Sequence, residues 1–555
     1  MGDLRKNQGG IPVDITPSLS DLHRSLINDM LSPEFLGIEQ VALLRAMDIS
    51  VDAAQSYIAD AIAEPDGAAQ IGTASGNTVQ QELDTRVGYT ALSASTGGDL
   101  VGFIQDGAGA VARTLLGKNR DIVHANDFGL VGDGTDETAL LQQALNAAVG
   151  KVLMLGNAKT YGIGSGGITI PANTTLISNG SKFKKLASSS TYGITISGSF
   201  NCDNLLYETV GGTNDAGINV AASDVTIGKV SATSLSANTG TGAPVNGLLI
   251  HKDDVTTLNR IWIGSVNIVE WAAPMRTRNV DGIYVGPVTI DNFRTGYYCI
   301  NTRNGMFVKG DVRGLSPSSV GGPGDNGVLI ESTFDYGTEN LMFVGWHVED
   351  AGEHGFRIGG QNVVRNIKYV GCSSTNSGAA TGATGGAAFK VLHGNTNPTY
   401  HENIIVDGFT AIDCGADPAS ANNNAAVQIG KVKGGQFSNF TIRKRNKTYS
   451  CRRGFQLIAS EDIEINNPNI TDAENYAFQF IQSGAVTPAY PTTMSRVHVN
   501  GGQAHCSQNA VGVIVAKFEV GDGTFTDVSI NGTTLSGGRI ATQHDTPTGA
   551  GAYVD

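Results

Sequence analysis

A short unit of small and apolar residues recurs along the chain. In each copy a small residue precedes an apolar residue, a variable residue and a second apolar residue, and successive copies begin 23 to 45 residues apart. Apolar side chains that alternate with period two are typical of a β-strand with one buried face. Ten copies therefore predict ten short strands: Tyr192–Ile196, Ala216–Val220, Asn246–Ile250, Asp281–Val285, Asn326–Ile330, His354–Ile358, Ala387–Val391, Ala425–Ile429, Arg453–Leu457 and Tyr476–Phe480.

Between these copies lies a second alternation, as in Asn403–Ile412 and Ile463–Ile470, so each unit holds two or three strands. Units of this length, with turns rich in Gly, Asn and Asp, indicate a parallel β-solenoid. A propeller is the alternative, but its blades need four antiparallel strands and more regular spacing. We therefore expect an all-β chain folded as a right-handed parallel β-helix.

The first quarter of the chain has a helical pattern instead. Residues 18–64 predict three short helices, because Leu22, Leu26 and Met30 recur every four residues and a similar stripe begins at Val51. So few helical residues bury too little surface to be comfortably stable alone, which predicts docking onto another protein. We expect a helical adaptor over 1–75, a neck over 76–120, the solenoid over 121–540 and a tail over 541–555.

The junction at Asp127–Thr138 predicts a strand, a Gly-rich turn and the start of a helix. In that helix Leu141, Ala144, Leu145 and Ala148 share one face, so it should cover the apolar end of the solenoid. The acidic residues Asp133, Asp136 and Glu137 could suggest a metal or catalytic site. Capping of the helix amides explains them better, because they lie where a helix begins.

Together with Gly102–Thr114, this junction resembles phage tailspikes of the pectate-lyase-like superfamily. The match continues through Val152–Leu155, Tyr161, Ile168–Pro171 and Thr175–Ile177, so its motifs cover roughly residues 100–185. Thr135-Asp136-Glu137 departs from the family, whose turn has one more residue and two consecutive Asp, so a tighter turn is expected. The resemblance implies a homotrimeric spike that binds a phage tail or baseplate protein through its N-terminal region. It also implies recognition, and in many members cleavage, of bacterial capsular polysaccharide or lipopolysaccharide.

The composition of the chain limits the classes of molecule that it can bind. The 73 glycines and 16% charged residues suit a fold with many turns, while a net charge of -14 disfavours nucleic acid as partner. The six cysteines are widely spaced and should be buried free thiols. The chain has no run of 18 apolar residues and begins without a signal-peptide pattern, so we expect a protein made in the host cytoplasm and carried on the virion tail, not inserted in a membrane. The motifs predict neither a cofactor nor a metal site.

Catalytic candidates come from the most acidic region, residues 331–353. Glycoside hydrolysis uses two carboxyl groups on either side of the scissile bond. We take Glu331, Asp335, Glu349 and Glu353 as candidate catalytic carboxylates, each with an exposed solubilising role as its alternative. By contrast, Asp350, Asn376 and Asp413 align in one repeat column and should be structural turn residues.

Candidate substrate-binding residues are aromatic and basic. Trp346 and Tyr336 lie within the acidic region and could stack on sugar rings, with core packing as the alternative. Arg443, Lys444 and Arg445 begin a basic cluster that extends to Arg453 and could hold an anionic glycan. Its alternative is pairing with Glu461, Asp462 and Glu464 on the next coil.

These features favour a tailspike that hydrolyses its polysaccharide as an endo-glycosidase. Elimination by a polysaccharide lyase is the second choice, because a lyase would more naturally show a basic residue among its candidates. A receptor-binding spike without catalysis and a free polysaccharide lyase are the remaining alternatives.

Overall fold

The structure is a computed structural model that divides the chain into two compact units, Met1–Asp121 and Ile122–Asp555. The residues it describes are 60, 81, 93–212, 215–237, 246–315, 325–378, 386–392, 399–415, 425–446, 451–482, 493–506, 516–520, 524–537 and 552–554. The helices expected within residues 18–64 lie outside the described residues, apart from Asp60, as does nearly all of the expected tail.

The described part of the first unit is a small hairpin followed by a helix. Strands β1 (Gly102–Phe103) and β2 (Arg113–Thr114) pair antiparallel, after the 3-10 helix η1 (Gly97–Leu100). The Thr114 side chain accepts a hydrogen bond of 2.9 Å from the Gly117 amide and so caps helix α7 (Leu115–Asn119). Arg113 forms an ion pair with Asp121, with 2.8 Å between nitrogen and oxygen.

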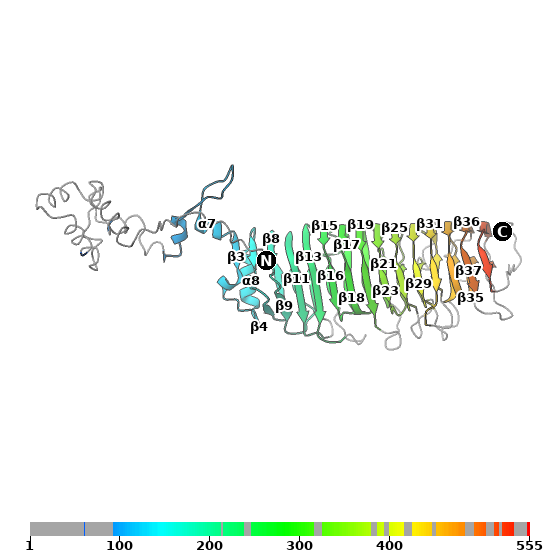
Figure 1. Ribbon diagram of the computed structural model, residues 1–555, viewed down its shortest axis with the longest axis horizontal. Helices are drawn as coiled ribbons and strands as arrows, with labels where there is room; N and C mark the ends of the chain where they lie inside the picture. Colours follow the sequence, from blue (N-terminus) through cyan, green and yellow to red (C-terminus); the bar gives the residue numbers. More distant parts are fainter. Residues whose placement is uncertain are drawn as a thin grey trace, which may run out of the picture. The chain divides into compact units, whose positions relative to one another are not determined.

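The second unit is a parallel β-helix with three sheets, which we name A, B and C in the order in which the chain passes through them (Figure 1). Each strand pairs in parallel with the equivalent strand one coil away, for example β21 with β24, β22 with β25 and β23 with β26. The predicted solenoid is therefore confirmed. Where the turn between sheets is short, one long strand bends through two of them, as in β17 and β19.

The strands of each sheet follow one another along the solenoid. Sheet A contains β7 (Ile168–Ile170), β10 (Tyr192–Ile196), β12 (Ala216–Val220), β14 (Asn246–Ile250), the first parts of β17 (Ala273–Val285) and β19 (Tyr297–Val308), β21 (Asn326–Glu331), β24 (His354–Ile358), β27 (Ala387–Leu392), β30 (Val427–Gly430), β33 (Cys451–Ile458), the last part of β35 (Asn469–Gln482) and β38 (Ala516–Val520).

Sheet B contains β3 (Ile122–His124), β5 (Val152–Met154), β8 (Thr174–Ile177), the first parts of β11 (Phe200–Thr209) and β13 (Val225–Ser234), β15 (Leu258–Ile263), the remainder of β17 and β19, β22 (Thr338–Val344), β25 (Val364–Val370), β28 (His401–Asp407), β31 (Val432–Ser438), β34 (Glu461–Asn466), β36 (Thr493–Asn500), β39 (Thr524–Asn531) and β41 (Ala552–Val554).

Sheet C contains β4 (Asp133–Asp136), β6 (Thr160–Ile163), β9 (Lys182–Lys185), the remainder of β11 and β13, β16 (Val266–Val269), β18 (Val288–Phe293), β20 (Gly310–Gly314), β23 (His347–Glu349), β26 (Ser373–Thr375), β29 (Thr410–Ile412), β32 (Thr441–Arg443), the first part of β35, β37 (Gln503–Cys506) and β40 (Thr534–Ser536).

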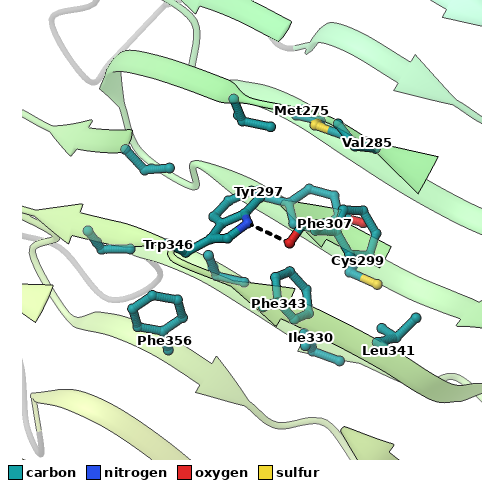
Figure 2. Packing of buried hydrophobic residues seen from close by; sticks show 14 of the residues in the cluster. Met275, Val285, Tyr297, Cys299, Phe307, Ile330, Leu341, Phe343, Trp346 and Phe356 are labelled. Atoms are coloured by element: carbon teal, nitrogen blue, oxygen red, sulfur yellow. Dashed lines mark hydrogen bonds between the residues drawn. The ribbon is translucent and has the colours of Figure 1, made fainter. Parts of the chain in front are cut away.

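The core is built from every second residue of each strand. In β25, for example, Ile367 and Tyr369 are buried while Lys368 between them is exposed, as period two requires. Over sheets A, B and C these inward side chains form one continuous apolar cluster. Near its middle the cluster becomes aromatic: Phe307 and Phe343 stack with ring centroids 4.8 Å apart, and Tyr297 lies against both (Figure 2).

The capping helix is confirmed. Helix α8 (Thr138–Ala147) buries Leu141, Ala144 and Leu145, which belong to the same core cluster as the first coils. The Asp136 carboxylate accepts hydrogen bonds from the Thr138 hydroxyl and, at 3.0 Å, from the Thr138 amide at the start of the helix, and these two bonds lower the pKa of Asp136 below its usual value. Glu137 accepts from the amides of Val131 and Gly132. The expected capping of the helix therefore holds for Asp136, whereas Asp133 and Glu137 accept hydrogen bonds from amides of the turn before the helix.

Stacked polar residues hold the turns between coils. Asp350, Asn376 and Asp413 have left-handed φ values of 56°, 51° and 54°, which Asp and Asn adopt more readily than most residues. The Asn376 amide group donates to the Asp350 carboxylate, and the Asp413 carboxylate accepts from the backbone amide of Arg445 at 2.8 Å. This column has the structural role that the repeat alignment predicted.

An asparagine ladder runs along sheet B in the same way. Asn304 donates to Asp281, and each following asparagine side chain donates to the one before it, at distances of 2.7 to 3.0 Å. The ladder comprises Asn304, Asn340, Asn366 and Asn403, all with left-handed φ. Each rung links one coil to the next and so fixes the register of the stack.

The repeat reading contains one error of register. Asp281–Val285 lies in sheet B as the second part of β17, whereas the strand of sheet A in that coil begins at Ala273. The following copy, at Tyr297, was missed as well. Ala273-Pro274 lacks the glycine that marks most copies. The spacings of 35 and 45 residues, from Asn246 to Asp281 and from Asp281 to Asn326, therefore concealed the copies at Ala273 and Tyr297.

All six cysteines are buried free thiols, as the sequence predicted. Cys202, Cys372 and Cys506 are removed from solvent, and burial raises their thiol pKa values above the ordinary value, that of Cys372 to about 11. These thiols remain protonated near neutral pH and serve as small apolar side chains in the core.

Candidate functional site

The outer face of sheet A carries a column of outward side chains, eight of them polar and two of them leucines. One outward position in each strand lies in register with the next. Most of these side chains are nearly removed from solvent, although they point away from the apolar core. We name this set the outer row: Asn219, Leu249, Arg276, Tyr298, Leu329, Arg357, Lys390, Gln428, Gln456 and Gln479.

Glu331 joins the outer row at the end of β21. Its carboxylate accepts a short hydrogen bond from the Tyr298 hydroxyl, one coil away. The Arg276 guanidinium lies 4.9 Å from the centre of the Tyr298 ring, in cation–π contact. Burial and the Glu331 carboxylate raise the pKa of Tyr298 well above its usual value, so its hydroxyl stays protonated and remains a donor.

Glu353 joins the row from the turn that precedes β24. Its carboxylate lies 3.4 Å from the Arg357 guanidinium and 3.4 Å from the His354 ring. His354 is fully buried, and desolvation together with the charge of Lys390 lowers its pKa to about 3. The imidazole is therefore neutral at pH 7. Of Arg357 and His354, only Arg357 forms an ion pair with Glu353.

The other two candidate carboxylates lie elsewhere. Asp335 is exposed in the turn between β21 and β22, where it accepts a hydrogen bond of 3.1 Å from the Val363 amide of the next coil. Glu349 belongs to β23 of sheet C, 3.8 Å from Arg313. The structure thus places Glu331 and Glu353 on the sheet A side of neighbouring coils, at opposite ends of the paired strands β21 and β24, and places Glu349 on sheet C.

Tyr336 occupies the same turn as Asp335. Arg365 lies 4.2 Å from the centre of its ring, and its hydroxyl donates to Glu402 at 3.1 Å. Its side chain is partly exposed, with a left-handed φ of 57°. The Tyr336 ring lies at the corner between sheets A and B, to one side of the outer row, so a sugar could reach it only there.

The basic candidates lie at the end of β32, in sheet C. Lys444 pairs with Asp472 at 3.3 Å, and Arg452 of the same cluster pairs with Glu474 at 2.9 Å. The expected alternative of pairing with Glu461, Asp462 and Glu464 is wrong in its partners. Glu461 and Asp462 pair instead with Lys433 and Arg496, and Glu464 accepts from Asn500. Arg443 lies in the same column of sheet C as Glu349, three strands away, and Arg445 follows the end of β32.

Trp346 cannot stack on a sugar, because its side chain is 0% exposed. Its indole nitrogen donates a hydrogen bond of 3.1 Å to the Phe307 carbonyl, and its ring contacts Phe343 with centroids 5.5 Å apart (Figure 2). A Cβ atom at Gly310 would come within 2.3 Å of the ring, so the coil is shaped around it. Trp346 is a core residue, and its assignment to the substrate site is corrected.

We therefore expect Trp346→Phe to reduce stability without changing the affinity for glycan. The smaller ring removes the buried hydrogen bond and leaves a cavity, which should cost about 1–3 kcal/mol of unfolding free energy. Urea unfolding followed by circular dichroism measures the first effect, and glycan binding at 25 °C measures the second. Loss of affinity in a variant of unchanged stability would return Trp346 to the binding site.

Sequence reasoning missed Arg276, Arg357 and Lys390 as site residues. Arg357 and Lys390 occupy the variable position of the repeat unit, in His354-Gly-Phe-Arg-Ile358 and Ala387-Ala-Phe-Lys-Val391. That position points outward on sheet A in every copy except Asp281–Val285, which lies in sheet B. Aligning the copies and comparing the residues at their variable position would therefore have revealed Arg357 and Lys390 as neighbours on one surface.

A second aromatic surface lies on sheet B. Trp262 is 43% exposed and stacks on Tyr284, with ring centroids 5.9 Å apart and 10° between the ring planes. The two residues face each other across paired strands β15 and β17. This pair offers a flat apolar surface to solvent and is the rival position for a sugar ring.

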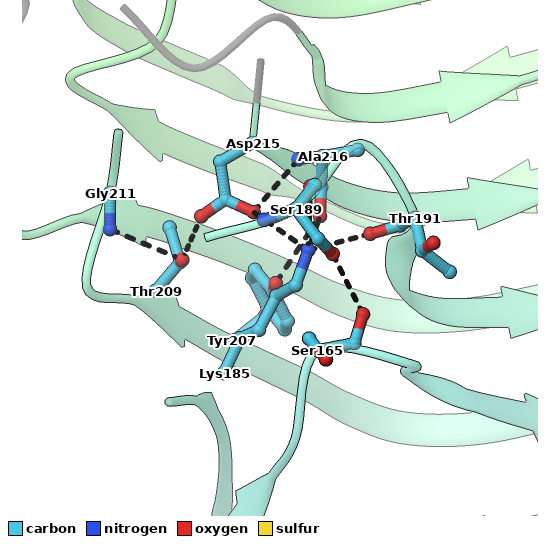
Figure 3. Close-up of polar contacts among 9 residues, drawn as sticks. All are labelled: Ser165, Lys185, Ser189, Thr191, Tyr207, Thr209, Gly211, Asp215 and Ala216. Atoms are coloured by element: carbon cyan, nitrogen blue, oxygen red, sulfur yellow. Dashed lines mark hydrogen bonds and ion pairs between the residues drawn. The ribbon is translucent and has the colours of Figure 1, made fainter. Parts of the chain in front are cut away.

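The most deeply buried charges form a separate network near the start of the solenoid. Lys185 and Asp215 are both 0% exposed and pair at 2.7 Å (Figure 3). The Lys185 ammonium also donates to the carbonyls of Ser189 and Thr191, and Asp215 accepts from the Thr209 hydroxyl and the Ala216 amide. Every group has its partners, so the network closes a turn between coils and leaves no free group for a ligand.

In the parts of the chain that the structure describes, no group of three or more His, Cys, Asp or Glu side chains could hold a metal ion. Within the same residues, no helix has the length and apolar character needed to cross a membrane.

The coils, the capping helix and the stacked turns define the class of the second unit, a parallel β-helix closed at its first coil. Solved structures similar to this chain include a tailspike protein of E. coli bacteriophage HK620 in complex with a hexasaccharide, at 12% identity and a TM-score of 0.38, covering 85% of this chain and 86% of that one. They also include the N-terminal fragment of bacteriophage Phi29 gene product 12, at 12% identity and a TM-score of 0.43, covering 78% and 74%. The A-module of an Azotobacter vinelandii mannuronan C-5 epimerase is similar at 13% identity and a TM-score of 0.39, covering 78% and 97%.

No protein-family model matches the chain, and no curated protein matches it.

Proposed function

We propose that this chain is a tailspike that binds a bacterial surface polysaccharide, capsule or lipopolysaccharide, along the outer row of sheet A and cleaves it as an endo-glycosidase. The observation that carries the proposal is that two carboxylates, Glu331 and Glu353, contact the outer row, at Tyr298 and at Arg357. Successive coils repeat outward positions along the solenoid axis, which suits an extended polymer.

The two carboxyl groups take different roles. A charged carboxylate is stabilised more by an ion pair with a guanidinium than by a hydrogen bond from a neutral phenol. Glu353, which lies beside Arg357, therefore acts as the base. Glu331, whose hydrogen-bond donor is the neutral Tyr298 hydroxyl, donates the proton to the leaving oxygen. Glu353 precedes β24 and Glu331 ends β21, so the two side chains approach the outer row from opposite ends of the paired strands.

Elimination is the second candidate, because basic groups lie in the same row. Lys390 is next to Arg357, and burial lowers the pKa of Lys390 to about 8, which suits a general base. In such a reaction the amine would remove a proton beside a uronic carboxylate and the glycosidic oxygen would leave. A free polysaccharide lyase would share this chemistry.

Assembly follows the resemblance to tailspikes. In this proposal residues 1–75 attach to a phage tail or baseplate protein, residues 76–120 form the neck, residues 121–540 present the outer row, and three copies form the spike on the virion tail. Asp335, Glu349, Tyr336, Arg443, Lys444 and Arg445 have no assigned role in cleavage. Light scattering of the full chain gives the number of copies directly.

Incubation with a panel of purified capsules and lipopolysaccharides tests the activity. We expect new reducing ends without ultraviolet absorbance from unsaturated uronates, because hydrolysis adds water across the broken bond. Reducing ends together with that absorbance would establish elimination instead. Binding without products on every polysaccharide would overturn cleavage and leave a receptor-binding spike.

A further inference from the structure

The outer row contains a buried cation without a partner. Lys390 is 8% exposed and lies between Arg357 and Gln428 in the column. Among the described residues, its ammonium makes no hydrogen bond and no ion pair within 4 Å. The nearby carboxylate of Glu353 contacts Arg357 instead. A buried charge normally has a partner, because desolvation is costly.

A second cation in the same column lacks a carboxylate. Arg276 is in contact with the ring of Tyr298, and its Nε atom is buried without a hydrogen-bond partner. Among the described residues its guanidinium has no ion pair within 4 Å, and the nearby Asp254 pairs with Arg278 instead. Four strand spacings separate Arg276 from Lys390, roughly 19 Å along the solenoid. The two cations therefore mark the ends of a stretch several sugar rings long.

An unsatisfied acceptor lies beside Lys390. Gln428 donates to Gln456, which in turn donates to Gln479 at 2.9 Å, so the Gln428 amide oxygen is left at the end of the ladder nearest Lys390. This oxygen is buried and has no hydrogen-bond partner. A cation and an acceptor side by side match one sugar unit that carries an anionic group and a hydroxyl.

The local charge has the opposite sign to that of the whole protein. The chain has a net charge of -14. Between Arg276 and Lys390 the cations Arg276, Arg357 and Lys390 face the carboxyl groups of Glu331 and Glu353, a balance of +1 with both ionised and +2 with Glu331 protonated. Arg278, in register with Glu331, is paired with Asp254. A positive strip of low exposure on an acidic protein attracts anionic groups and strengthens each contact with them.

We infer that the polysaccharide is acidic, and that anionic groups spaced along it pair with Lys390 and Arg276 while the Gln428 amide oxygen accepts a sugar hydroxyl. This inference deepens the proposed function and rests on it. It specifies the chemical class of the substrate and two binding residues that act apart from Glu331 and Glu353.

Matched polysaccharides test the substrate class. Each capsule that binds is measured intact and after carbodiimide activation and borohydride reduction, which convert uronic carboxylates to alcohols. We expect affinity to fall at least about tenfold on reduction, as the loss of one charge-assisted hydrogen bond implies. A capsule charged through phosphate should keep its affinity on reduction and lose it on dephosphorylation. Equal affinity for charged and neutral forms would overturn the inference.

Lys390→Met tests the residue. Methionine fills a similar volume without charge, so the variant should fold with equal or greater thermal stability, while its affinity for the acidic glycan falls about tenfold to a hundredfold. Lys368→Met is the matched control, because Lys368 is exposed on sheet B. Wild-type affinity retained by Lys390→Met would overturn the assignment.

Cleavage of neutral polysaccharides alone would contradict only this inference, whereas absence of binding to any polysaccharide would contradict the proposed function.

The pH dependence supplies an independent readout. Desolvation first and the charge of Arg357 second lower the pKa of Lys390 to about 8, while Glu353 opposes them. His354 also faces this group but is neutral above its pKa of about 3. The ammonium is present below pH 8 and lost above it, so affinity should decline between pH 7 and pH 9 in the wild type and stay flat in Lys390→Met. A decline of equal size in both proteins would contradict the role of Lys390.

Discussion

Glu353→Gln should cleave the polysaccharide about 10²- to 10⁴-fold more slowly than the wild type, the usual contribution of a general acid or base. Glutamine keeps the size of the side chain but cannot take a proton from water. Glu331→Gln should have an effect of similar size, because its amide cannot protonate the leaving oxygen. Initial rates of reducing-end release at saturating polysaccharide measure both variants, and affinity should change by only a few-fold.

Two comparisons make this result specific to the outer row. Glu339→Gln is the matched control, since Glu339 lies on sheet B and pairs with Arg365 at 2.5 Å, away from the proposed site. Its cleavage rate should equal that of the wild type. Glu349→Gln examines the candidate on sheet C. If that variant alone lost activity, the catalytic pair would have to move to sheet C, beside Arg443.

Asp215→Ala should lower the free energy of unfolding by about 3–5 kcal/mol, because it leaves the ammonium of Lys185 buried without its carboxylate. The Thr209 hydroxyl and the Ala216 amide lose their acceptor as well. Urea unfolding of the full chain, followed by far-ultraviolet circular dichroism, measures the change.

Removing both charges should restore most of that stability. In Lys185→Met with Asp215→Leu, apolar side chains replace the pair, and such replacements are often neutral or stabilising. Glu208→Gln is the control, because Glu208 pairs with the partly exposed Lys182 and should contribute less than about 1 kcal/mol. A loss below 1 kcal/mol in Asp215→Ala would show that the network does not stabilise the first coils.

The fold was predictable because its determinants are local. Period-two alternation, Gly and Asn turns and the apolar face of residues 138–148 each depend on neighbours in sequence. The column of Asp350, Asn376 and Asp413 was also predictable, since one turn repeats in three coils. The register of the coil at Ala273 was not, because Pro274 replaces the small residue that marks the strand.

The site was harder to predict because nearness in sequence does not give nearness in a coil. Glu349 is only four residues from Glu353, yet it lies on sheet C while Glu353 reaches sheet A. Trp346 belongs to the acidic segment but points into the core. Conversely, Arg276 and Lys390 are 114 residues apart and occupy one column, which only the pairing of successive coils reveals.

The measurement that tests the central claim most directly is an experimental structure of the full chain carrying Glu353→Gln, in complex with an oligosaccharide from the polysaccharide that it binds. We expect the sugar chain to lie over the outer row from β17 to β27, with its scissile bond between Glu331 and the substituted residue and with anionic groups at Arg276 and Lys390. A sugar chain bound to Trp262 and Tyr284 on sheet B, or beside Glu349 and Arg443 on sheet C, would contradict the account.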